Sequence, residues 1–399
     1  MIKILVVYPH NFFEERNGIN TRYIELLKFF KTRNFKVDML ALKNFKTSWE
    51  NYPTDKGGLI NELVFYDFKK GSRGQKQRNK MKNLWARIRK RIPFFYAYTH
   101  LPDFSYPGMK KQFDEIVKKN QYDFILISYV YWANLLQSPS TKKELCITLL
   151  DLSDFLTLNK FDSSGGDVKI GGMLEEEIRR VNLFDKVMCI SGDEQFFFSQ
   201  FALRPQYYYV PFFIKKNSIS RDSNPQYDIV FVGSENPHNL KGMKWFFDNI
   251  YSLLGKSIRM VIVGSISKYI KARDNVVCFR HLENLDDVYA KSRVSICPLL
   301  GGTGLKIKVV EALSFGLPVI TTYKGVAGLP SKINNGCLIA DSPEDFANRI
   351  NKLLKDKELY DYHSQQALDF FLEHFEKLKV YHQLDEIFLN EKQEMKILK

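Results

Sequence analysis

Glycines and lysines with the spacing of an anion-binding loop lie together just after residue 300. The segment GGTGLKIKVVE begins at Gly301 and carries three glycines in its first four positions. Such a loop lets a ligand approach the backbone and exposes amide groups at the start of a helix, where the helix dipole favours an anion. Lys306 and Lys308 fall in the first helical turn, an unfavourable place for cations unless a ligand supplies negative charge. We therefore predict that this loop binds a diphosphate, although simple turn chemistry fits the bare pattern equally well.

Glu311 lies two turns from the predicted phosphate site on the same helix. A carboxylate there can accept hydrogen bonds from both hydroxyls of a ribose, and we assign Glu311 this role. The alternative is an i, i+3 pair with Lys308, which stabilises a helix by only about 0.2–0.5 kcal/mol. A helical wheel directs one side of the helix toward the sheet and the other outward or into a cleft; the first holds Leu305, Val309, Ala312 and Leu313, the second Ile307, Lys308, Glu311 and Ser314.

The elements that position this motif follow one plan twice. A strand-like run at 2–8 and a helical stretch at 21–33 precede a second strand, and the runs at 228–233, 241–254 and 258–264 repeat that order. Short β-branched runs alternating with amphipathic helices are typical of βαβ units around a parallel sheet. Two α/β domains with doubly wound parallel sheets are therefore expected. Further buried strands are predicted at 123–130, 146–152, 186–191, 293–299 and 318–322.

The length of 399 residues fits two such domains. Residues 1–210 form the predicted N-terminal domain, 211–226 a polar linker, and 227–360 the C-terminal domain. Residues 361–399 are expected to be helical, with packing back onto the N-terminal domain as one arrangement. The first strand is not followed by a G-x-G-x-x-G turn, which argues against a dinucleotide enzyme.

The net charge of +14 is mostly local. Residues 69–91 contain eleven lysines and arginines and no acid, which leaves only +3 for the rest of the chain. A solvated loop, a membrane-surface helix and a nucleic-acid arm are the three interpretations. Apolar and aromatic side chains accompany the charges through residue 98, so we favour an anionic membrane as the partner of residues 69–98 and expect no nucleic-acid partner.

Cysteines and histidines give no sign of a metal site. The five cysteines are scattered and the seven histidines have no ligand spacing, so neither a disulfide framework nor a metal is expected. The N-terminal apolar run ends near Tyr8, too early for a signal peptide or a membrane span, and a cytoplasmic protein is predicted. His10 follows the first strand, and Asp151 and Asp154 follow another, where parallel sheets form sites. A helix cap is the alternative role for one of the two aspartates.

From Tyr227 to about Asp356, the chain resembles the C-terminal domain of the group 1 glycosyltransferases, the GT4-type enzymes of the GT-B fold. The matching pieces are DIVFVGSENPHNLKG, MVIVG, VVCFRHLENLDDVYAKSRVSICPL, the block G-x-K-x-K-x-x-E-A-L-x-x-G-x-P-V-I, and YKGVAGLP. The resemblance implies two Rossmann-like domains facing a central cleft. It also implies an N-terminal acceptor domain and a C-terminal domain that binds a nucleotide-diphosphate-sugar.

The resemblance assigns roles to residues of both domains. Glycines contact the donor diphosphate, lysines neutralise it and Glu311 holds the ribose; the donor-binding set is Gly233, Ser234, Lys241, Gly302, Thr303, Gly304, Lys306, Lys308 and Glu311. The N-terminal domain matches more loosely, through LLDLSDFLTLNKF and through Gly18-Ile19-Asn20. The implied acceptor-side residues are His10, Gly18, Asn20, Ser153 and Asp154.

Two positions depart from the family pattern. Thr303 stands where the family has a glutamate, and the position of the family's cleft histidine is taken by Ser153 or, in another alignment, by Leu150. No nucleophile is evident, and the catalytic candidates are Thr303, Lys308 and Asp154. The resemblance implies retaining transfer to a hydroxyl of a glycan, lipid-linked as one option, in surface polysaccharide or glycoconjugate synthesis, without metal or cofactor, at the inner face of the cell membrane. The alternative is a non-catalytic sugar-nucleotide-binding or scaffold protein on the same fold.

Overall fold

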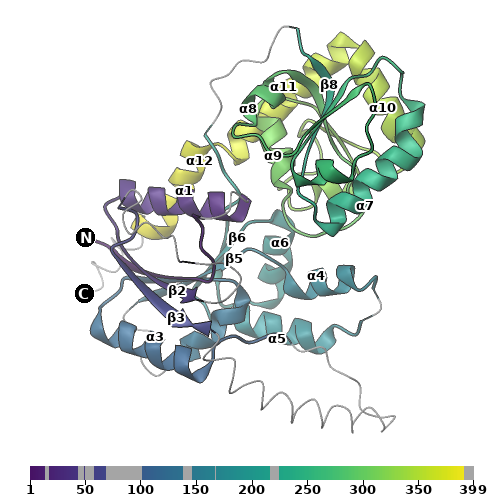
Figure 1. Ribbon diagram of the computed structural model, residues 1–399. Helices are drawn as coiled ribbons and strands as arrows, with labels where there is room; N and C mark the ends of the chain where they lie inside the picture. Colours follow the sequence, from purple (N-terminus) through teal and green to yellow (C-terminus); the bar gives the residue numbers. More distant parts are fainter. Residues whose placement is uncertain are drawn as a thin grey trace, which may run out of the picture. The chain divides into compact units, whose positions relative to one another are not determined.

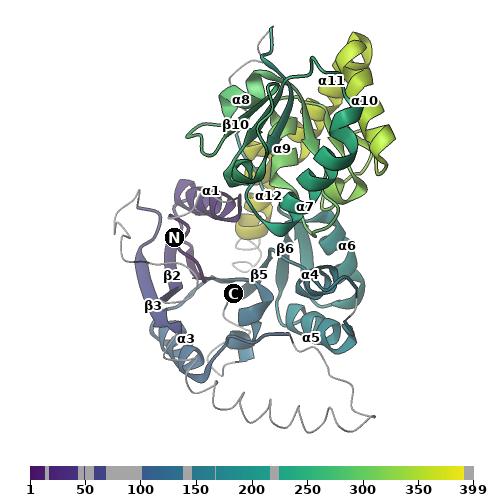
Figure 2. The same ribbon diagram turned by 45° about the vertical axis from the view of Figure 1, so that its right-hand side comes forward.

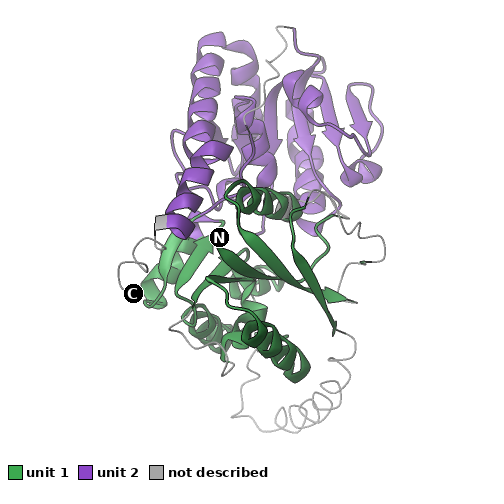
Figure 3. Cartoon of the chain, turned by 90° about the vertical axis from the view of Figure 1, so that its left-hand side faces the viewer, with its two compact units in different colours: residues 1–190, 194–209 green, residues 191–193, 210–399 purple. Residues whose placement is uncertain are grey.

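The chain divides into two compact units (Figure 3). Unit 1 comprises residues 1–190 and 194–209, and unit 2 comprises residues 191–193 and 210–399. The basic segment 69–91 with its aromatic edge to residue 98, and residues 216–223 of the predicted linker, lie outside the described residues. A computed structural model of the chain describes residues 1–13, 18–43, 49, 58–68, 101–137, 146–166, 168–215 and 224–390.

Unit 1 is built on a parallel seven-stranded sheet in the order β3-β2-β1-β4-β5-β6-β7. The central strands β1 and β4 consist almost entirely of buried apolar side chains, as expected for a parallel sheet covered on both faces. The strands are β1 (Lys3–Tyr8), β2 (Lys36–Lys43), β3 (Glu62–Asp67), β4 (Phe124–Ser128), β5 (Ile147–Leu152), β6 (Lys186–Cys189) and β7 (Gln206–Tyr209).

Helices cover both faces of this sheet. The first helix, α1, and the later α3 lie on opposite sides of the strands (Figures 1 and 2). The described helices are α1 (Gly18–Thr32), α3 (Pro107–Lys119), the 3-10 helix η1 (Val130–Gln137), α4 (Leu156–Ser163), α5 (Gly171–Val181) and α6 (Gly192–Phe201). None of the helices in the described part of the chain has the length and apolar character needed to cross a bilayer.

Unit 2 contains a parallel six-stranded sheet in the order β10-β9-β8-β11-β12-β13. Its core is formed by apolar side chains of these strands and of the surrounding helices, including Phe231, Met243 and Phe346. The strands are β8 (Tyr227–Val232), β9 (Met260–Val263), β10 (Val276–Phe279), β11 (Ser292–Cys297), β12 (Val319–Thr321) and β13 (Cys337–Ile339).

Helices and short helical turns connect the strands of unit 2. Ser342 caps α10 by accepting a hydrogen bond from the Asp345 amide at 3.2 Å. The long stretch predicted at 241–254 is instead α7 followed by a π turn and a 3-10 turn. The elements are α7 (Pro237–Trp245), η2 (Phe246–Ile250), η3 (Tyr251–Leu253), η4 (Ser265–Tyr269), α8 (Asp286–Ala290), α9 (Ile307–Ser314), η5 (Tyr323–Val326), α10 (Pro343–Lys355), α11 (Lys357–His374), α12 (Lys377–Asp385) and η6 (Glu386–Asn390).

The helices after Asp356 belong to unit 2, and α11 packs against α9. Helix α11 also lies close to Gly336, just before β13, where a Cβ atom would lie 2.4 Å from that of Ala367. At the turn between α11 and α12, Glu376 forms a parallel β-bridge with Ile214.

Each sheet has one point where the strand order reverses. In unit 1 it lies between β1 and β4, and in unit 2 between β8 and β11. Ligands of open α/β sheets bind beyond the carboxyl ends of the strands at such a point. The loops after β1, β4 and β5 in unit 1, and after β8 and β11 in unit 2, are therefore where sites are expected.

Candidate functional site

The loop after β8 approaches its neighbours so closely that only glycine fits at its first position. A Cβ atom at Gly233 would lie 2.8 Å from the Phe231 ring and 3.0 Å from Nδ2 of Asn239. Ser234 follows, exposed, and α7 then begins with its Asn236 side chain accepting a hydrogen bond from the Asn239 amide at 2.9 Å. The start of α7 is thereby held against the end of β8.

The glycine loop after β11 uses left-handed backbone conformations at two of its glycines. Gly302 has φ 97° and Gly304 has φ 69°, a region that other residues rarely adopt. A Cβ atom at Gly302 would also lie 3.4 Å from the ring of His238 in the first turn of α7. The loop therefore lies against the start of α7, on the other side of the point where the strand order reverses.

Lys306 braces the glycine loop from within. It is the N-cap residue of α9 and precedes the first helical turn, so its predicted place inside that turn is wrong. Its Nζ donates hydrogen bonds to the carbonyl oxygens of Gly302, Thr303 and Gly304 at 3.4, 3.0 and 2.7 Å. The Lys306 ammonium therefore has backbone carbonyls as hydrogen-bond acceptors. These hydrogen bonds hold the glycine loop around it.

Lys308, two residues after Lys306, is held by an amide and an aromatic ring. Its Nζ donates to Oδ1 of Asn239 at 2.6 Å and lies 4.3 Å from the centre of the Phe231 ring. Burial lowers the pKa of Lys308 because it disfavours the charged form. An anionic ligand would relieve this cost, so the environment suits a phosphate contact.

Asn239 was missed by the sequence analysis and links the two sides of the site. Besides accepting from Lys308, its Nδ2 donates to the Ser234 carbonyl at 2.9 Å, and only 4% of the residue is exposed. No signal in the sequence singles out this asparagine, because its partners lie on a separate loop and helix.

Asn239→Ala should lower affinity for a nucleotide diphosphate by about tenfold, because Lys308 loses the group that orients it. It should also destabilise unit 2 by about 1–3 kcal/mol, since Lys308 and the Ser234 carbonyl lose hydrogen bonds. Thermal melts and titration calorimetry with UDP measure both effects. Asn249→Ala is the matched control, because the exposed Asn249 side chain only donates to the Trp245 carbonyl. Equal UDP affinity in the two variants would contradict the assigned role.

Glu311 lies half-buried on α9 and accepts a hydrogen bond from the Tyr289 hydroxyl at 3.1 Å. Burial raises the pKa of its carboxyl to about 7, against the opposing effects of the Tyr289 hydrogen bond and of Lys308. Among the described residues, Glu311 forms no ion pair, so the predicted alternative of pairing with Lys308 is wrong. Its carboxylate remains suited to accepting hydroxyl hydrogen bonds. Tyr289, on α8, was not predicted as a site residue.

The predicted faces of α9 need one correction. Val309, Ala312 and Leu313 are fully buried as predicted, but Ser314, placed on the outward side, is only 3% exposed. Helix α11 packs against α9 as well, so α9 is covered on more than its sheet side. Lys241 lies exposed on α7, and its predicted contact with a diphosphate stays a prediction.

In unit 1, the end of β1 is anchored by a buried hydrogen bond to α1. The Tyr8 hydroxyl donates to Oδ1 of Asn20 at 2.8 Å, and the Tyr8 ring stacks on Tyr23 with centroids 3.8 Å apart. Asn20 is 3% exposed, and Gly18 is the first residue of α1. Gly18 and Asn20, two of the predicted acceptor-side residues, therefore lie near the carboxyl end of β1. The Asn20 side chain holds that strand end in place through Tyr8.

The end of β5 carries a buried ion pair. Asp151 lies within β5 and pairs with Arg22 at 2.7 Å, with both side chains nearly inaccessible. Ser153 follows and its Oγ donates to Asp151 at 3.4 Å. Asp154 is half-buried and accepts a hydrogen bond from Nδ2 of Asn159 at 3.3 Å.

The helix-capping alternative for these aspartates is wrong. Phe155 is the N-cap residue of α4, and the amides of Leu156 and Thr157 donate instead to the buried carboxylate of Glu177, at 2.8 and 2.9 Å. Glu177 lies on α5, so α5 fixes the start of α4 directly after Asp154.

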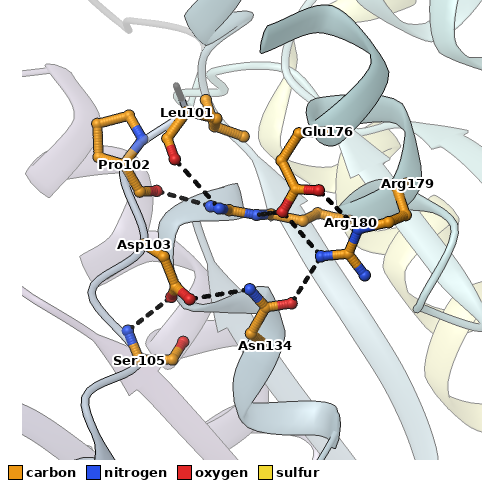
Figure 4. A network of polar contacts seen from close by, with 8 residues as sticks. All are labelled: Leu101, Pro102, Asp103, Ser105, Asn134, Glu176, Arg179 and Arg180. Carbon is orange, nitrogen blue, oxygen red and sulfur yellow. Dashed lines mark hydrogen bonds and ion pairs between the residues drawn. The ribbon is translucent and has the colours of Figure 1, made fainter. Parts of the chain in front are cut away.

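Helix α5 also fixes the loop and helix beside β4, through a network of polar contacts (Figure 4). Its Glu176 accepts hydrogen bonds from Arg179 and Arg180, and these hold the pKa of Glu176 near 2. Arg180 donates to the carbonyls of Pro102 and Leu101 at 2.6 and 3.2 Å. Arg179 donates to Asn134 of η1 at 3.0 Å, and Asn134 donates to Asp103.

Arg180→Ala should destabilise unit 1 by about 2–4 kcal/mol, because the buried Leu101 carbonyl and the partly buried Pro102 carbonyl lose their donor, and Glu176 loses an ion-pair partner. Arg179→Ala is the matched control, since its partly exposed guanidinium contacts the same Glu176 and its loss should cost about 1 kcal/mol or less. Urea unfolding followed by circular dichroism compares the two. Equal destabilisation by both substitutions would contradict the role given to Arg180.

His10 lies at the edge of unit 1 beside an unusual tyrosine. The His10 ring centroid lies 5.9 Å from that of Tyr8 and 6.1 Å from that of Tyr129. Tyr129 follows β4 with φ 67°, in the left-handed region. This conformation could not be predicted from the residue type, because left-handed backbone is normally associated with glycine or asparagine.

The structure joins none of the cysteines in a disulfide. All five are free thiols. Within the ranges that the structure describes, no group of three or more histidine, cysteine or acidic side chains could hold a metal ion.

Comparison with known proteins agrees with the predicted family of the C-terminal domain. Residues 226–356 match the family described as "Glycosyl transferases group 1". The chain is 26% identical over 216 residues to a Klebsiella pneumoniae protein named "Uncharacterized 44.6 kDa protein in cps region". That alignment spans 50% of this chain and 54% of the relative, so the chain spans about half of this curated protein's length.

Solved structures match over almost the whole chain. Sucrose-phosphate synthase from Thermosynechococcus elongatus aligns with a TM-score of 0.70 and 14% identity, covering 97% of this chain and 98% of the other. Anabaena Alr3699/HepE in complex with UDP aligns with a TM-score of 0.64 and 13% identity, covering 97% and 99%. The predicted fold is confirmed: the chain has two doubly wound parallel sheets of the GT-B type.

Proposed function

We propose that this chain, which carries a group 1 glycosyl transferase domain in residues 226–356, transfers a sugar from a nucleotide-diphosphate-sugar to a hydroxyl of a glycan acceptor. The observation that carries the proposal is the arrangement at the reversal point of the unit 2 sheet. A glycine loop braced by Lys306 lies there beside the ammonium of Lys308 and the carboxylate of Glu311. Unit 2 would bind the donor and unit 1 the acceptor.

The geometry supports electrostatic assistance to the leaving diphosphate. As the glycosidic bond breaks, negative charge grows on the phosphate oxygens, and fixed positive groups lower the energy of that state. Lys308 and the amides at the start of α9 would provide them, with Lys241 as a further cation. Glu311 would accept hydrogen bonds from ribose hydroxyls. Thr303 is half-buried in the glycine loop, where its hydroxyl is a candidate for contacting the transferred sugar.

A donor screen tests the proposal directly. UDP, GDP and dTDP, and their sugars, should be compared by thermal shift, since a ligand that binds only the folded state raises the melting temperature. The crystal structure of Anabaena Alr3699/HepE is a complex with UDP, so UDP-sugars are the first donors to try. Transfer from the labelled donor is then measured. No binding and no turnover with any donor would overturn the proposal.

The finer chemistry is proposed from the family resemblance. We expect the retaining, GT4-type course, with the leaving phosphate assisting deprotonation of the acceptor hydroxyl, and no requirement for a metal. NMR of the product's anomeric proton tests retention. Assays with EDTA test the metal requirement, and a loss of turnover that Mg²⁺ restores would contradict it.

A lipid-linked acceptor at the inner face of the cell membrane is also proposed, in surface polysaccharide or glycoconjugate synthesis. Its support is the sequence of residues 69–98, where eleven cations precede a run of aromatic side chains. The full chain should sediment with vesicles containing 30% phosphatidylglycerol and be released by high salt. Equal sedimentation with neutral phosphatidylcholine vesicles would contradict electrostatic attachment. We expect no binding to nucleic acid.

A second candidate is a protein on the same fold that binds sugar nucleotides without turning them over. Thr303 and Ser153 favour it, because neither can act as the carboxylate or imidazole that the resemblance leads one to expect at these positions. Tight donor binding without hydrolysis or transfer, across a broad acceptor panel, would support this candidate over the enzyme.

A further inference from the structure

Tyr289 provides the one hydrogen bond that the Glu311 carboxylate accepts from the described residues. The Tyr289 hydroxyl on α8 donates to Oε2 of Glu311 on α9 at 3.1 Å, which leaves Oε1 without a hydrogen-bond donor in the described chain. We infer that Tyr289 is a positioning residue of the donor site, whose hydroxyl holds Oε2 of Glu311 and leaves Oε1 for a ribose hydroxyl. This inference rests on the proposed function, and it adds a residue that acts through Glu311.

Packing fixes the Tyr289 ring. Only 2% of the residue is exposed, and its ring stacks on that of Phe315 with centroids 5.4 Å apart and planes inclined by 21°. Phe315 is the C-cap residue of α9, so the stack joins α8 to the end of the helix that carries Glu311. Because the ring cannot turn away, its hydroxyl oxygen has one position, and so has the carboxylate oxygen bonded to it.

The Tyr289 hydroxyl keeps its proton at neutral pH. Burial raises the pKa of Tyr289 well above its ordinary value, and the charge of Glu311 adds to this effect. A hydroxyl that keeps its proton can donate to an ionised carboxylate, and such a charge-assisted hydrogen bond is stronger than one between neutral groups. Tyr289 therefore favours the ionised form of Glu311.

Burial opposes the ionised form of Glu311. It is the largest effect and raises the pKa of the Glu311 carboxyl to about 7, against the lowering effects of the Tyr289 hydrogen bond and of Lys308. Asp286 of α8 adds a smaller increase. Helix α11 and strands β11 and β12 also pack against α9, and their described residues contribute no charged group to this set. Tyr289 and Lys308 are therefore the groups that keep part of Glu311 ionised at neutral pH.

Tyr289→Phe tests the inference through the pH profile of UDP-glucose binding. Phenylalanine keeps the ring that stacks on Phe315 and removes the hydroxyl, so the pKa of Glu311 should rise further. The midpoint of UDP-glucose affinity against pH should move upward by about one pH unit, since one hydrogen bond to a charged group is lost. Titration calorimetry should show binding about fivefold weaker than in the parent protein at pH 7 and less than about threefold weaker at pH 9.

A double-mutant cycle separates an effect through Glu311 from any other effect of the substitution. In the Glu311→Gln background, Tyr289→Phe should change UDP-glucose affinity by less than about twofold and leave its pH profile flat, because no carboxylate remains to be held. Equal losses of affinity in the two backgrounds would overturn the inference. So would a profile of Tyr289→Phe that runs parallel to that of the parent protein, without a shift.

Tyr122→Phe is the matched control, in unit 1. The buried Tyr122 hydroxyl donates to Oδ2 of Asp38 at 3.0 Å, so its removal also breaks a hydrogen bond between a hydroxyl and a carboxylate. This variant should have a lower melting temperature and the same UDP-glucose profile as the parent protein. A shifted midpoint in Tyr122→Phe as well would attribute the effect to general destabilisation and would overturn the inference.

The melting temperature gives a second measurement, which needs no ligand. Tyr289→Phe should lower the melting temperature more at pH 8 than at pH 5, because Glu311 is ionised at the higher pH and then loses its only described hydrogen-bond donor. An equal decrease at both pH values would indicate that Tyr289 contributes to packing alone and would contradict its action on the carboxylate.

Binding by the parent protein distinguishes the two possible failures. If the parent protein binds UDP-glucose and Tyr289→Phe shows an unshifted profile, the role of Tyr289 is refuted and the proposed function stands. If the parent protein binds no nucleotide or nucleotide-sugar, the proposed function is refuted, and the ribose role of Tyr289 with it. Both titrations use the full chain with UDP-glucose between pH 5 and pH 9.

Discussion

Lys308→Met should lower affinity for UDP by about 10- to 100-fold while leaving the folded protein nearly as stable as before. A hydrogen bond to a charged group contributes about 1.5–3 kcal/mol, and each 1.4 kcal/mol corresponds to a factor of ten. Methionine keeps an unbranched apolar side chain and removes the ammonium, whose Nζ lies 4.3 Å from the centre of the Phe231 ring. Titration calorimetry with UDP and UDP-glucose measures the loss.

The stability of the same variant tells a direct role from a structural one. Because burial already lowers the pKa of Lys308, removing its charge relieves a desolvation cost, which offsets the hydrogen bond that Asn239 loses. The free energy of unfolding should therefore change by about 1 kcal/mol or less. Lys244→Met is the control, since the exposed Lys244 side chain pairs with Asp248 on the same helical stretch. UDP affinity that stays unchanged in Lys308→Met would exclude Lys308 from the donor site.

The fold could be predicted because its signals are local. Runs such as ILVVY and FILIS are apolar at every position, which is expected of strands buried on both faces, and the alternation with amphipathic helices identifies βαβ units. The glycine loop could also be predicted, because the left-handed backbone at positions 302 and 304 strongly favours glycine. These features depend on neighbouring residues alone.

The contacts that hold the site could not be predicted, because they join residues far apart in the chain. Asn239 and Lys308 are 69 positions apart, and no pattern in the sequence fixes how α7 lies against α9. Tyr289 and Glu311 meet in the same way across 22 positions. The capping rule failed for Asp151 because it looks only for a local acceptor, whereas α4 is capped by Glu177, 20 residues downstream.

Lys306 shows where a sound rule gave an incomplete answer. A lysine at the start of a helix predicts that an anionic ligand binds there. In the structure, three backbone carbonyls of the glycine loop accept its hydrogen bonds. Loop carbonyl oxygens can therefore take the place of an anionic ligand beside a lysine, a possibility that the helix dipole alone does not indicate. Lys308 is therefore the stronger candidate for a diphosphate contact, since its hydrogen-bond acceptor among the described residues is one neutral amide, that of Asn239.

The free energy of unfolding of unit 2 should fall as pH rises from about 4.5 to about 8, because of Glu311. Burial raises the pKa of its carboxyl from 4.5 to about 7, so between these values the native state holds a proton that the unfolded chain has lost. Stability therefore falls as pH rises through this window, by about 2–3 kcal/mol at pH 8. Glu311→Gln removes this term, and its melting temperature should exceed that of the parent protein by about 5–10 °C at pH 8 but match it near pH 5.

Donor affinity should show the opposite dependence. Ribose hydroxyls donate to the ionised carboxylate, so the affinity for UDP-glucose should rise about tenfold between pH 6 and pH 8 as Glu311 loses its proton. UDP-glucose suits the measurement because its diphosphate diester keeps a constant charge over this range. Glu311→Gln should bind UDP-glucose about 10- to 100-fold more weakly at pH 8 and show a flat profile. Parallel profiles of UDP-glucose affinity against pH for the two proteins would remove Glu311 from the donor site. If Glu311→Gln is more stable than the parent protein but binds UDP-glucose more weakly, then the Glu311 carboxylate serves binding rather than folding.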